Sequence, residues 1–258
     1  MSIYQHFRPE EHLFIDHALA WKKEVEQSYR MKLTDFLDPR EQQILSMLVG
    51  TNQDDFELHF HGGGMYTERK RAVICPFYED VDFSTFDLVL LEATFHQKFI
   101  SLTHRDVMGA FLSLGIERKK LGDIFIEDNH LQIITTADIA TYVEMNLTKI
   151  KNASIKLTTK PFKELLEKEA NWISADHTIS SLRLDNVIKE IYRISRSESA
   201  NLIKKKLVKV NFRVVEDAAY PLFEGDLLSV RGKGRSKLVA IHGKTKKDKF
   251  RVTSAILK

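Results

Sequence analysis

One stretch of the sequence limits the fold more than any other, because between residues 87 and 159 the hydrophobic pattern changes period in a fixed order. Four short apolar runs have the length and composition of strands, and they lie at residues 87–95, 123–127, 131–136 and 154–159. Helical spacing fills the first and last intervals. The first helix opens with the capping pair Thr103 and Asp106, and the second has an apolar face made by Ile139, Val143, Leu147 and Ile150. This β-α-β-β-α-β order predicts a ferredoxin-like or RRM-like sheet packed under two helices.

The flanking residues complete a predicted α+β protein of three domains. Helical spacing runs through the first 50 residues, with a second helix start at Asp38 and Pro39, and residues 55–78 have the pattern of a hairpin whose glycines 62–64 lie in the connection. The polar residues 168–181 are expected to form a linker. The predicted domains are a helical cap with a hairpin at 1–85, the RRM-like domain at 86–170 and a C-terminal α+β domain at 181–258.

Charge is divided unevenly along the chain. Residues 181–258 hold 19 Lys or Arg and 8 Asp or Glu, a net of +11, whereas the preceding 180 residues hold 20 and 28, a net of −8. A compact segment with so large a positive excess repels itself unless a polyanion is its usual neighbour. The C-terminal domain is therefore expected to bind RNA.

The sequence also indicates a cellular compartment. Its first residues, MSIYQHFRPEE, are charged and lack the apolar core of a secretion signal, and the longest aliphatic run, Leu88 to Leu91, is too short to span a bilayer. A single cysteine, Cys75, cannot form an internal disulfide or a thiolate cluster, which agrees with a reducing compartment. We expect a cytoplasmic protein without a membrane span, in which Cys75 is buried and unreactive.

The basic C-terminal segment has the pattern of two short helices followed by a small hairpin. The first helix has an apolar stripe made by Leu184, Val187, Ile188 and Ile191. A capping box at Ser195 and Glu198 starts the second helix, whose inward positions are Ala200, Ile203 and Leu207. Alternating apolar residues then predict a strand at 208–212, and Gly225 with Asp226 predicts a turn into a partner strand at 227–231.

Polar and cationic side chains that this small core leaves outward form the predicted RNA-binding site. The start of the second helix adds unpaired backbone N–H groups, which attract phosphate without reading sequence. The expected site residues are Arg183, Lys189, Arg193, Ser195, Arg196, Ser197, Lys204, Lys205, Lys206, Lys209, Asn211, Arg213, Arg231, Lys233 and Arg235. No catalytic residue, metal ligand or cofactor is expected.

These residues carry a resemblance to a known module. The strings Arg183-Leu184-Asp185, Ser195-Arg196-Ser197, Val208-Lys209-Val210-Asn211 and Gly225-Asp226 resemble the S4 domain, the RNA-binding module first described in ribosomal small-subunit protein S4. The resemblance implies that Arg183 and Arg196 contact the RNA backbone. Phe212 departs from the family, since many members have glycine after the asparagine, and this departure bears on the turn geometry and on any contact by Asn211.

Two further strings extend the resemblance to nearly the whole chain. LHFHGGGMYTERKRAVICP and LTHRDVMGAFLSLGIERKKLGDIFIE, ahead of a C-terminal S4 domain, resemble the YlmH family of Gram-positive bacteria. The family is encoded among cell-division genes and is linked to ribosome-associated quality control. The resemblance therefore implies binding to ribosomal or transfer RNA on the large ribosomal subunit while stalled nascent chains are processed.

The middle domain lacks the features with which RRM domains hold bases. Those domains stack bases on aromatic side chains of the third strand, and the equivalent segment here, HLQIITT, has no aromatic residue and no basic-glycine start. A scaffold or protein-docking role is therefore expected for it, and residues 1–170 are a candidate surface for a protein partner.

Motifs of catalytic chemistry are incomplete in this chain. The string His61 to Gly64 matches the oxyanion-hole sequence of esterases, but no G-x-S-x-G nucleophile elbow accompanies it and no Gly-Lys-Ser/Thr follows, so a strained turn is expected. His59 and His61 share one strand face with Glu57 but have no convincing further metal ligand, so structural histidines are expected.

Two alternatives to an RNA-binding protein without catalytic activity stay open. S4 domains also occur in enzymes, but the catalytic aspartate motif of pseudouridine synthases, the H-I-G-H and K-M-S-K-S signatures of tyrosyl-tRNA synthetases and the glycine-rich turn of methyltransferases have no counterpart here. An RNA-modifying enzyme of the pseudouridine synthase kind is therefore the first alternative. A cell-division adaptor that docks protein partners through its acidic N-terminal part is the second.

Overall fold

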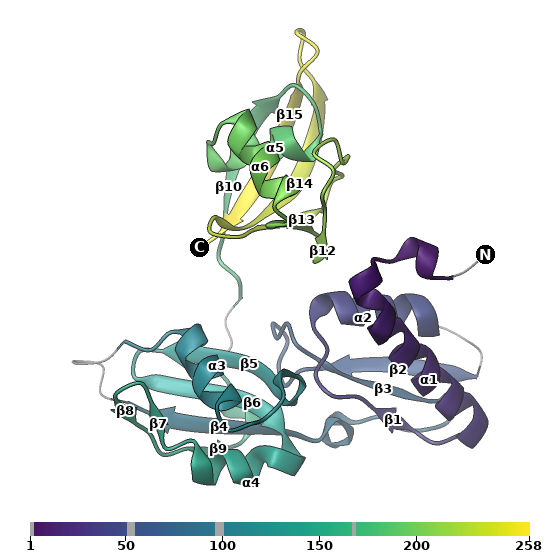
Figure 1. The fold of residues 1–258 in the computed structure, drawn as a ribbon, viewed down its shortest axis with the longest axis vertical. Coiled ribbons are helices and arrows are strands. Elements are labelled where there is room, and N and C mark those ends of the chain that lie inside the picture. The colour runs from purple at the N-terminus through teal and green to yellow at the C-terminus, as the bar shows by residue number, and fades with distance from the viewer. Residues whose placement is uncertain (1–2, 51–54, 96–100, 167–168) are drawn as a thin grey trace. The chain divides into compact units, whose positions relative to one another are not determined.

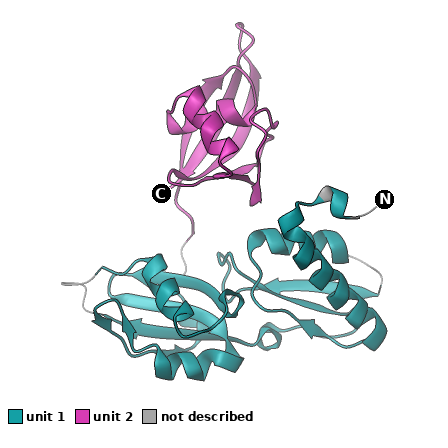
Figure 2. Cartoon of the chain, in the orientation of Figure 1, with its two compact units in different colours: residues 1–168 teal, residues 169–258 magenta. Residues whose placement is uncertain are grey.

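A computed structural model describes residues 3–50, 55–95, 101–166 and 169–258 (Figure 1). The chain is divided into two units, residues 1–168 and 169–258 (Figure 2). Both units combine helices with antiparallel sheets, so the α+β class is confirmed. The domain boundary predicted near residue 85 lies inside the first unit and stays a prediction.

The N-terminal part of the first unit is two helices packed on a small sheet. Asp38 accepts hydrogen bonds from the backbone N–H groups of Arg40 and Glu41, and the Glu41 carboxylate accepts one from the Asp38 N–H, so the predicted helix start is a full capping box. The sheet has the order β1-β3-β2, and its strand β1 was not predicted. The elements are η1 (Ile3–His6), η2 (Pro9–Glu11), α1 (His12–Ser28), β1 (Lys32–Leu33), α2 (Pro39–Val49), β2 (Phe56–His61) and β3 (Arg71–Pro76).

The rest of the first unit has the predicted β-α-β-β-α-β order. Its sheet runs β5-β6-β4-β9 with every pair antiparallel, which is the ferredoxin-like arrangement. Thr103 and Asp106 cap the first helix as predicted. The elements are η3 (Phe83–Phe86), β4 (Leu88–Thr94), α3 (His104–Leu112), η4 (Arg118–Lys120), β5 (Leu121–Glu127), β6 (His130–Thr136), α4 (Ala137–Asn146), β7 (Lys149–Ile150), β8 (Ala153–Ser154), β9 (Thr158–Lys160) and η5 (Phe162–Glu164).

Two predictions for the last part of this domain were wrong. The second helix does not reach Ile150, because it ends at Asn146 and the chain turns into the short hairpin β7–β8, with Lys151 at a φ of 50°. The last strand starts at Thr158 and not at Ser154, since Ser154 pairs with Lys149 instead. The apolar side chains of Leu147 and Ile150 are still buried in the same core as the helices, so the hydrophobic pattern was right about burial and wrong about helix length.

Side chains cover the sheet face opposite α3 and α4, the face with which RRM domains hold RNA. Phe36, from the chain between β1 and α2, packs there with Leu90 and Ile134, and Phe162 and Leu165 pack beside them. Gly122 makes room for Phe36, since a Cβ at this position would lie 2.8 Å from the ring. The expectation that this domain does not hold bases as an RRM does therefore has a steric reason.

The second unit, residues 169–258, has two helices on one six-stranded antiparallel sheet of order β10-β15-β14-β13-β11-β12 (Figure 1). Its core contains the predicted apolar stripe of the first helix together with Ile203, Val208 and Val210. The elements are β10 (Trp172–Ile179), α5 (Leu184–Tyr192), α6 (Arg196–Lys204), β11 (Val208–Val210), β12 (Arg213–Val214), β13 (Leu227–Val230), β14 (Gly234–Lys244) and β15 (Phe250–Leu257).

The predicted linker and the predicted size of this sheet were wrong. Within residues 168–181, of which residue 168 lies outside the described part, strand β10 pairs with β15 over eight residue pairs. Its polar and apolar residues alternate irregularly because most of the strand is exposed, so the sequence lacks a strand-like period. The sheet is also larger than the predicted hairpin, since β14 and β15 extend it. In the described part of the chain, no helix has the length and apolar content needed to cross a membrane.

Candidate nucleic-acid interface

Arg183 and Arg196 are held by one buried carboxylate. Arg183 donates to both oxygens of Asp185, at 3.1 and 3.2 Å, and the Nε of Arg196 lies 3.4 Å from Asp185 Oδ2. The Asp185 side chain is 4% exposed, whereas that of Arg196 is 71% exposed. Asp185 thus fixes the base of two guanidinium groups whose outer faces meet solvent.

Opposing effects set the charge state of Asp185. Burial acts to raise the pKa of this carboxyl, but the hydrogen bonds and positive charges of Arg183 and Arg196 outweigh burial, and the pKa lies below its ordinary value. The carboxylate is therefore ionised at neutral pH. It cancels part of the positive charge of the two arginines, and its hydrogen bonds orient their guanidinium groups.

The start of α6 lies beside this cluster. The hydroxyl of Ser195 accepts a hydrogen bond from the Glu198 N–H and lies 2.9 Å from the hydroxyl of Ser197, so both serines serve the helix start. The predicted capping box is only half formed, because the Glu198 carboxylate does not bond the Ser195 backbone. It lies instead 3.3 Å from the ammonium of Lys233, in the turn between β13 and β14.

The same turn lines a cationic groove. A cavity of about 470 Å³ opens between the end of α6, β11 and the β13–β14 turn. Lys209 and Arg235 both lie opposite Ser229 in the sheet register, on adjacent strands to either side of it. The groove is lined by Lys206, Leu207, Lys209, Phe212, Ser229, Val230, Arg231, Gly232, Gly234 and Arg235.

The cations of the groove differ in their surroundings. Lys206 lies 3.4 Å from Glu216, and burial lowers the pKa of the half-buried Arg235 guanidinium. Lys209 and Arg231 are exposed, and among the described residues neither has an ion-pair partner. These two are therefore the groove cations most available to an anion.

Asn211 and Phe212 form the tight turn between β11 and β12. Both have left-handed backbones, with φ of 47° and 67°, as a two-residue hairpin of this kind requires. The Asn211 side chain donates to Asp226 and accepts from the Leu227 N–H, at 2.8 and 2.9 Å. The turn forms without the glycine common in the S4 family, and the Asn211 amide is occupied in holding it.

The remaining predicted site residues lie apart from the groove lining. Lys189 pairs with the adjacent Glu190 at 2.8 Å, and Arg193 ends α5 in a left-handed conformation. Lys204 and Lys205 are exposed at the end of α6, and Arg213 is exposed on the edge strand β12. The structure therefore gathers most of the predicted cations around α6 and the β13–β14 turn, and places a minority elsewhere.

Sequence reasoning missed two features of this unit. The sequence showed Asp185 only as part of the S4-like string, although an acidic residue in the first turn of a helix, two residues after Arg183, is a signal for an ion pair at the helix start. The lysines of the β14–β15 hairpin were counted in the net charge but not among the site residues. Their signal is the run Lys-Thr-Lys-Lys-Asp-Lys at residues 244–249.

Elsewhere the structure assigns packing roles to the motifs that suggested chemistry. His61 Nδ1 accepts a hydrogen bond from the Gly63 N–H at 2.9 Å, and Gly63 has a φ of 104°, so the string forms a turn whose positive φ glycine adopts readily, and no strain is needed to explain it. A Cβ at Gly62 would lie 2.3 Å from the Arg69 carbonyl oxygen. Burial, followed by Glu57 and Glu79, raises the pKa of the buried Cys75 thiol to about 11. Among the described residues, no three His, Cys, Asp or Glu side chains gather as a metal site would require.

The helix pair, the antiparallel sheet and the cationic surface around α6 define a protein with a C-terminal RNA-binding module of the S4 class. Residues 182–228 match the model of the S4 domain, and residues 82–164 match the model described as "Putative RNA-binding domain in YlmH". The chain is 47% identical, over 98% of its own length and 97% of the relative's, to "Ribosome-associated protein quality control protein P2" of Bacillus subtilis (strain 168). It belongs to the YlmH family.

A solved structure agrees with this assignment. "Cell division protein ylmH from Streptococcus pneumoniae" is similar with a TM-score of 0.55 and 33% identity, over 64% of this chain and all of that one. The description of the matched middle domain also bears on its expected role. It names RNA binding, whereas the sequence favoured a scaffold, and the covered sheet face means that any such binding uses another surface.

Proposed function

We propose that this protein binds structured RNA on the ribosome, without catalysis, and acts there in the quality control of stalled nascent chains. The RNA is ribosomal RNA of the large subunit, transfer RNA, or both, and the site is the cationic surface of the C-terminal unit. The name of the Bacillus subtilis relative and the S4 match support the ribosomal setting. A ribosomal setting also supports the predicted cytoplasmic location.

One observation carries this proposal: the β13–β14 turn joins the two groups of cations. Lys233 of this turn pairs with Glu198 in the first turn of α6, next to Arg196. Arg231 and Gly232 of the same turn, and Gly234 at the start of β14, line the groove with Lys209. A phosphate backbone that reaches Arg183 and Arg196 can therefore continue along one surface to Lys209 and Arg231. Such contacts give affinity and position without reading base sequence.

Substitution of the two exposed groove cations tests the site. Lys209→Gln together with Arg231→Gln should weaken binding to transfer RNA and large-subunit RNA by about tenfold or more near 100 mM salt, because each phosphate contact adds about 0.9 to the slope of log affinity against log salt. Filter binding over a salt series measures both quantities, and the slope should fall by about 2.

The matched control removes the same two charges from the N-terminal helix region. Lys23→Gln with Arg30→Gln also replaces one exposed lysine and one exposed arginine, outside both matched domains. The control variant should bind RNA as the unmodified protein does, and the control variant and the unmodified protein should both co-sediment with ribosomes. Equal binding by the groove variant and the control would reject the site.

The name of the Streptococcus pneumoniae relative supports a second candidate, an adaptor in cell division. In that case, the acidic first unit, residues 1–168, would bind protein partners, and this binding would persist after RNA is removed. Affinity capture with and without ribonuclease separates the two functions, because partners bridged by ribosomal RNA are lost on digestion and adaptor partners are kept.

A further inference from the structure

The long hairpin β14–β15 is the second concentration of positive charge in the C-terminal unit. Residues 242–251 hold five Lys or Arg and one Asp, a net of +4 in ten residues. This segment lies beyond the stretch that matches the S4 model, residues 182–228, and none of its residues lines the groove. Figure 1 shows the hairpin reaching past the helices of the unit.

The tip of the hairpin has a defined backbone. The Thr245 N–H donates to the Lys249 carbonyl at 2.7 Å, the Asp248 N–H donates to the Thr245 carbonyl at 3.0 Å, and Asp248 has a φ of 55°. Lys244 is used inside the hairpin, 2.7 Å from Asp248 and 5.2 Å from the centre of the Phe250 ring. The one acidic residue of the tip is thereby neutralised by the lysine at its base.

Four cations remain exposed on this hairpin, and we call them the hairpin surface: Lys246, Lys247, Lys249 and Arg251. Across the ranges that the structure describes, none of the four has an ion-pair partner. Most of the positive charge of the tip is therefore accessible to solvent or to a ligand.

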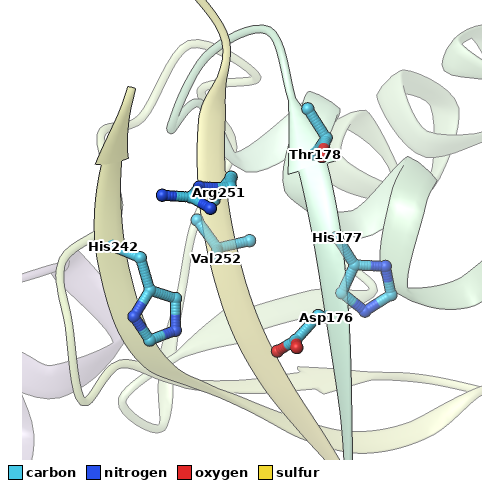
Figure 3. A pocket seen from close by; sticks show the side chains of 6 residues that line it. All are labelled: Asp176, His177, Thr178, His242, Arg251 and Val252. Atoms are coloured by element: carbon cyan, nitrogen blue, oxygen red, sulfur yellow. The ribbon is translucent and has the colours of Figure 1, made fainter. Parts of the chain in front are cut away.

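Arg251 also lines a cavity of about 400 Å³ at the base of the hairpin, between β10, β15 and the end of β14 (Figure 3). The Asp176 carboxylate of this cavity accepts a hydrogen bond from the Thr253 hydroxyl at 2.6 Å, and His242 Nε2 lies 2.7 Å from the same hydroxyl. Because the Thr253 proton is given to Asp176, His242 donates through Nε2. The carboxylate is thus held by Thr253, and Arg251 and Thr178 line the same cavity.

The hairpin surface and the groove lie at opposite ends of strand β14. The groove lies at the Gly234 end of β14 and the hairpin surface at the Lys244 end. Ten steps along a regular strand span roughly 30 Å at about 3.3 Å per residue, which is an upper bound here because the register of β14 shifts at Leu238–Ala240 and at Ile241–Lys244. Since both belong to the same sheet, an extended or folded RNA can contact both ends, whereas a mononucleotide reaches only one.

The chemistry of the tip favours RNA over an acidic protein as its ligand. Protein interfaces are depleted in lysine and enriched in buried aromatic residues. At the tip the aromatic ring of Phe250 already packs under Lys244, the exposed Asp248 is paired with the same lysine, and the other exposed charged residues are lysines and an arginine. Lysines of this kind neutralise phosphates and release counterions, which gives affinity without sequence reading.

We propose that the hairpin surface is a second contact for the RNA phosphate backbone, which acts with the groove to bind one RNA at two places up to about 30 Å apart. The inference rests on the proposed RNA-binding function and extends it to a surface outside the S4 match. It assigns Lys246, Lys247, Lys249 and Arg251 to direct phosphate contact.

The test uses the full chain and two matched variants. In the first, Lys246, Lys247, Lys249 and Arg251 are replaced by Gln; in the second, the three lysines become Arg and Arg251 becomes Lys, so that charge is kept. Binding to bulk transfer RNA and to protein-free large-subunit RNA is measured over a salt series. The first variant should lose about tenfold or more in affinity near 100 mM salt and about 2 to 4 in slope, and the second should keep both.

The groove variant distinguishes failure of this inference from failure of the proposed function. Loss of binding by the groove variant with normal binding by the hairpin variant overturns the second contact and leaves the first. Normal binding by both overturns both. A hairpin variant that binds RNA normally but no longer co-sediments with ribosomes contacts protein, which also overturns the inference. If the four-residue variant fails to melt cooperatively, the three-lysine variant carries the same test.

Discussion

Asp185 shows how one residue links folding to function in this protein. Its carboxylate is buried, yet it stays ionised because two guanidinium groups reach it from the surface. A buried charge with both partners present is tolerated, whereas its loss leaves two arginines without an anchor. The residue therefore positions Arg183 and Arg196 and stabilises the start of α5.

The variant Asp185→Asn should be less stable than the unmodified protein by about 2 kcal/mol at pH 7, the usual worth of a charge-assisted hydrogen bond. The folded-state pKa of Asp185 lies below the unfolded value, so its stabilisation is present above about pH 4 and is lost as pH falls through the folded pKa. The free energy of unfolding of the unmodified chain should thus fall more steeply in acid than that of the variant.

The fluorescence of Trp172 can report this unfolding, in a Trp21→Phe background that leaves one tryptophan. Urea titrations from pH 7 to pH 3 give the free energies. Parallel pH profiles for the two proteins would show that the Asp185 charge does not contribute to stability.

Phe212 stands where many S4 domains have glycine, and the structure shows where its side chain lies. A left-handed backbone at a non-glycine residue costs about 1 kcal/mol. The ring lines the cationic groove, where it forms an apolar wall beside Lys209 and Arg231 that glycine would not supply.

Strand β10 shows the limits of pattern reading at the scale of elements. Strands with one buried face alternate clearly, but β10 is an edge strand with few buried positions, and its polar residues resemble a linker. It nevertheless pairs with β15 along its whole length and contributes the buried Ile179 to the core.

Two fragments test the role of this strand. Residues 169–258 should melt cooperatively, whereas residues 181–258 lack β10 and should lose about 2 kcal/mol or more from Ile179 burial alone, with a lower Tm. Circular dichroism melts of the two fragments make the comparison. Equal melting temperatures would show that β10 is not needed by the rest of the unit.

The two units of the molecule differ in net charge and in the surface that they leave open to RNA. The positive excess lies in the C-terminal unit, and the sheet face of the middle domain is occupied by Phe36, Phe162 and Leu165. We therefore expect the C-terminal unit to make most phosphate contacts.

The fragment 169–258 should bind transfer RNA with a salt slope within about one unit of that of the full chain, since each contact adds about 0.9. Filter binding of both over the same salt series measures this. A slope steeper by two or more for the full chain would instead show that the first unit, whose middle domain is described as RNA-binding in the matched model, contacts phosphates too.

Features that depend only on neighbouring residues along the chain could be predicted from the sequence. The capping residues Asp38 and Thr103, the apolar stripe of α5 and the division of charge are local or additive properties, and the structure agrees with them. The β-α-β-β-α-β order followed from the same periodicity.

Contacts between residues far apart in the sequence became visible in the folded structure alone. The pairing of β10 with β15, the hold of Asp185 on Arg196, the covering of the middle sheet by Phe36 and the groove around the β13–β14 turn all join segments that carry no local sign of one another. Strand pairing and ion pairing depend on partners brought close by the packed core, and a hydrophobic period specifies which face is buried but not what lies against it.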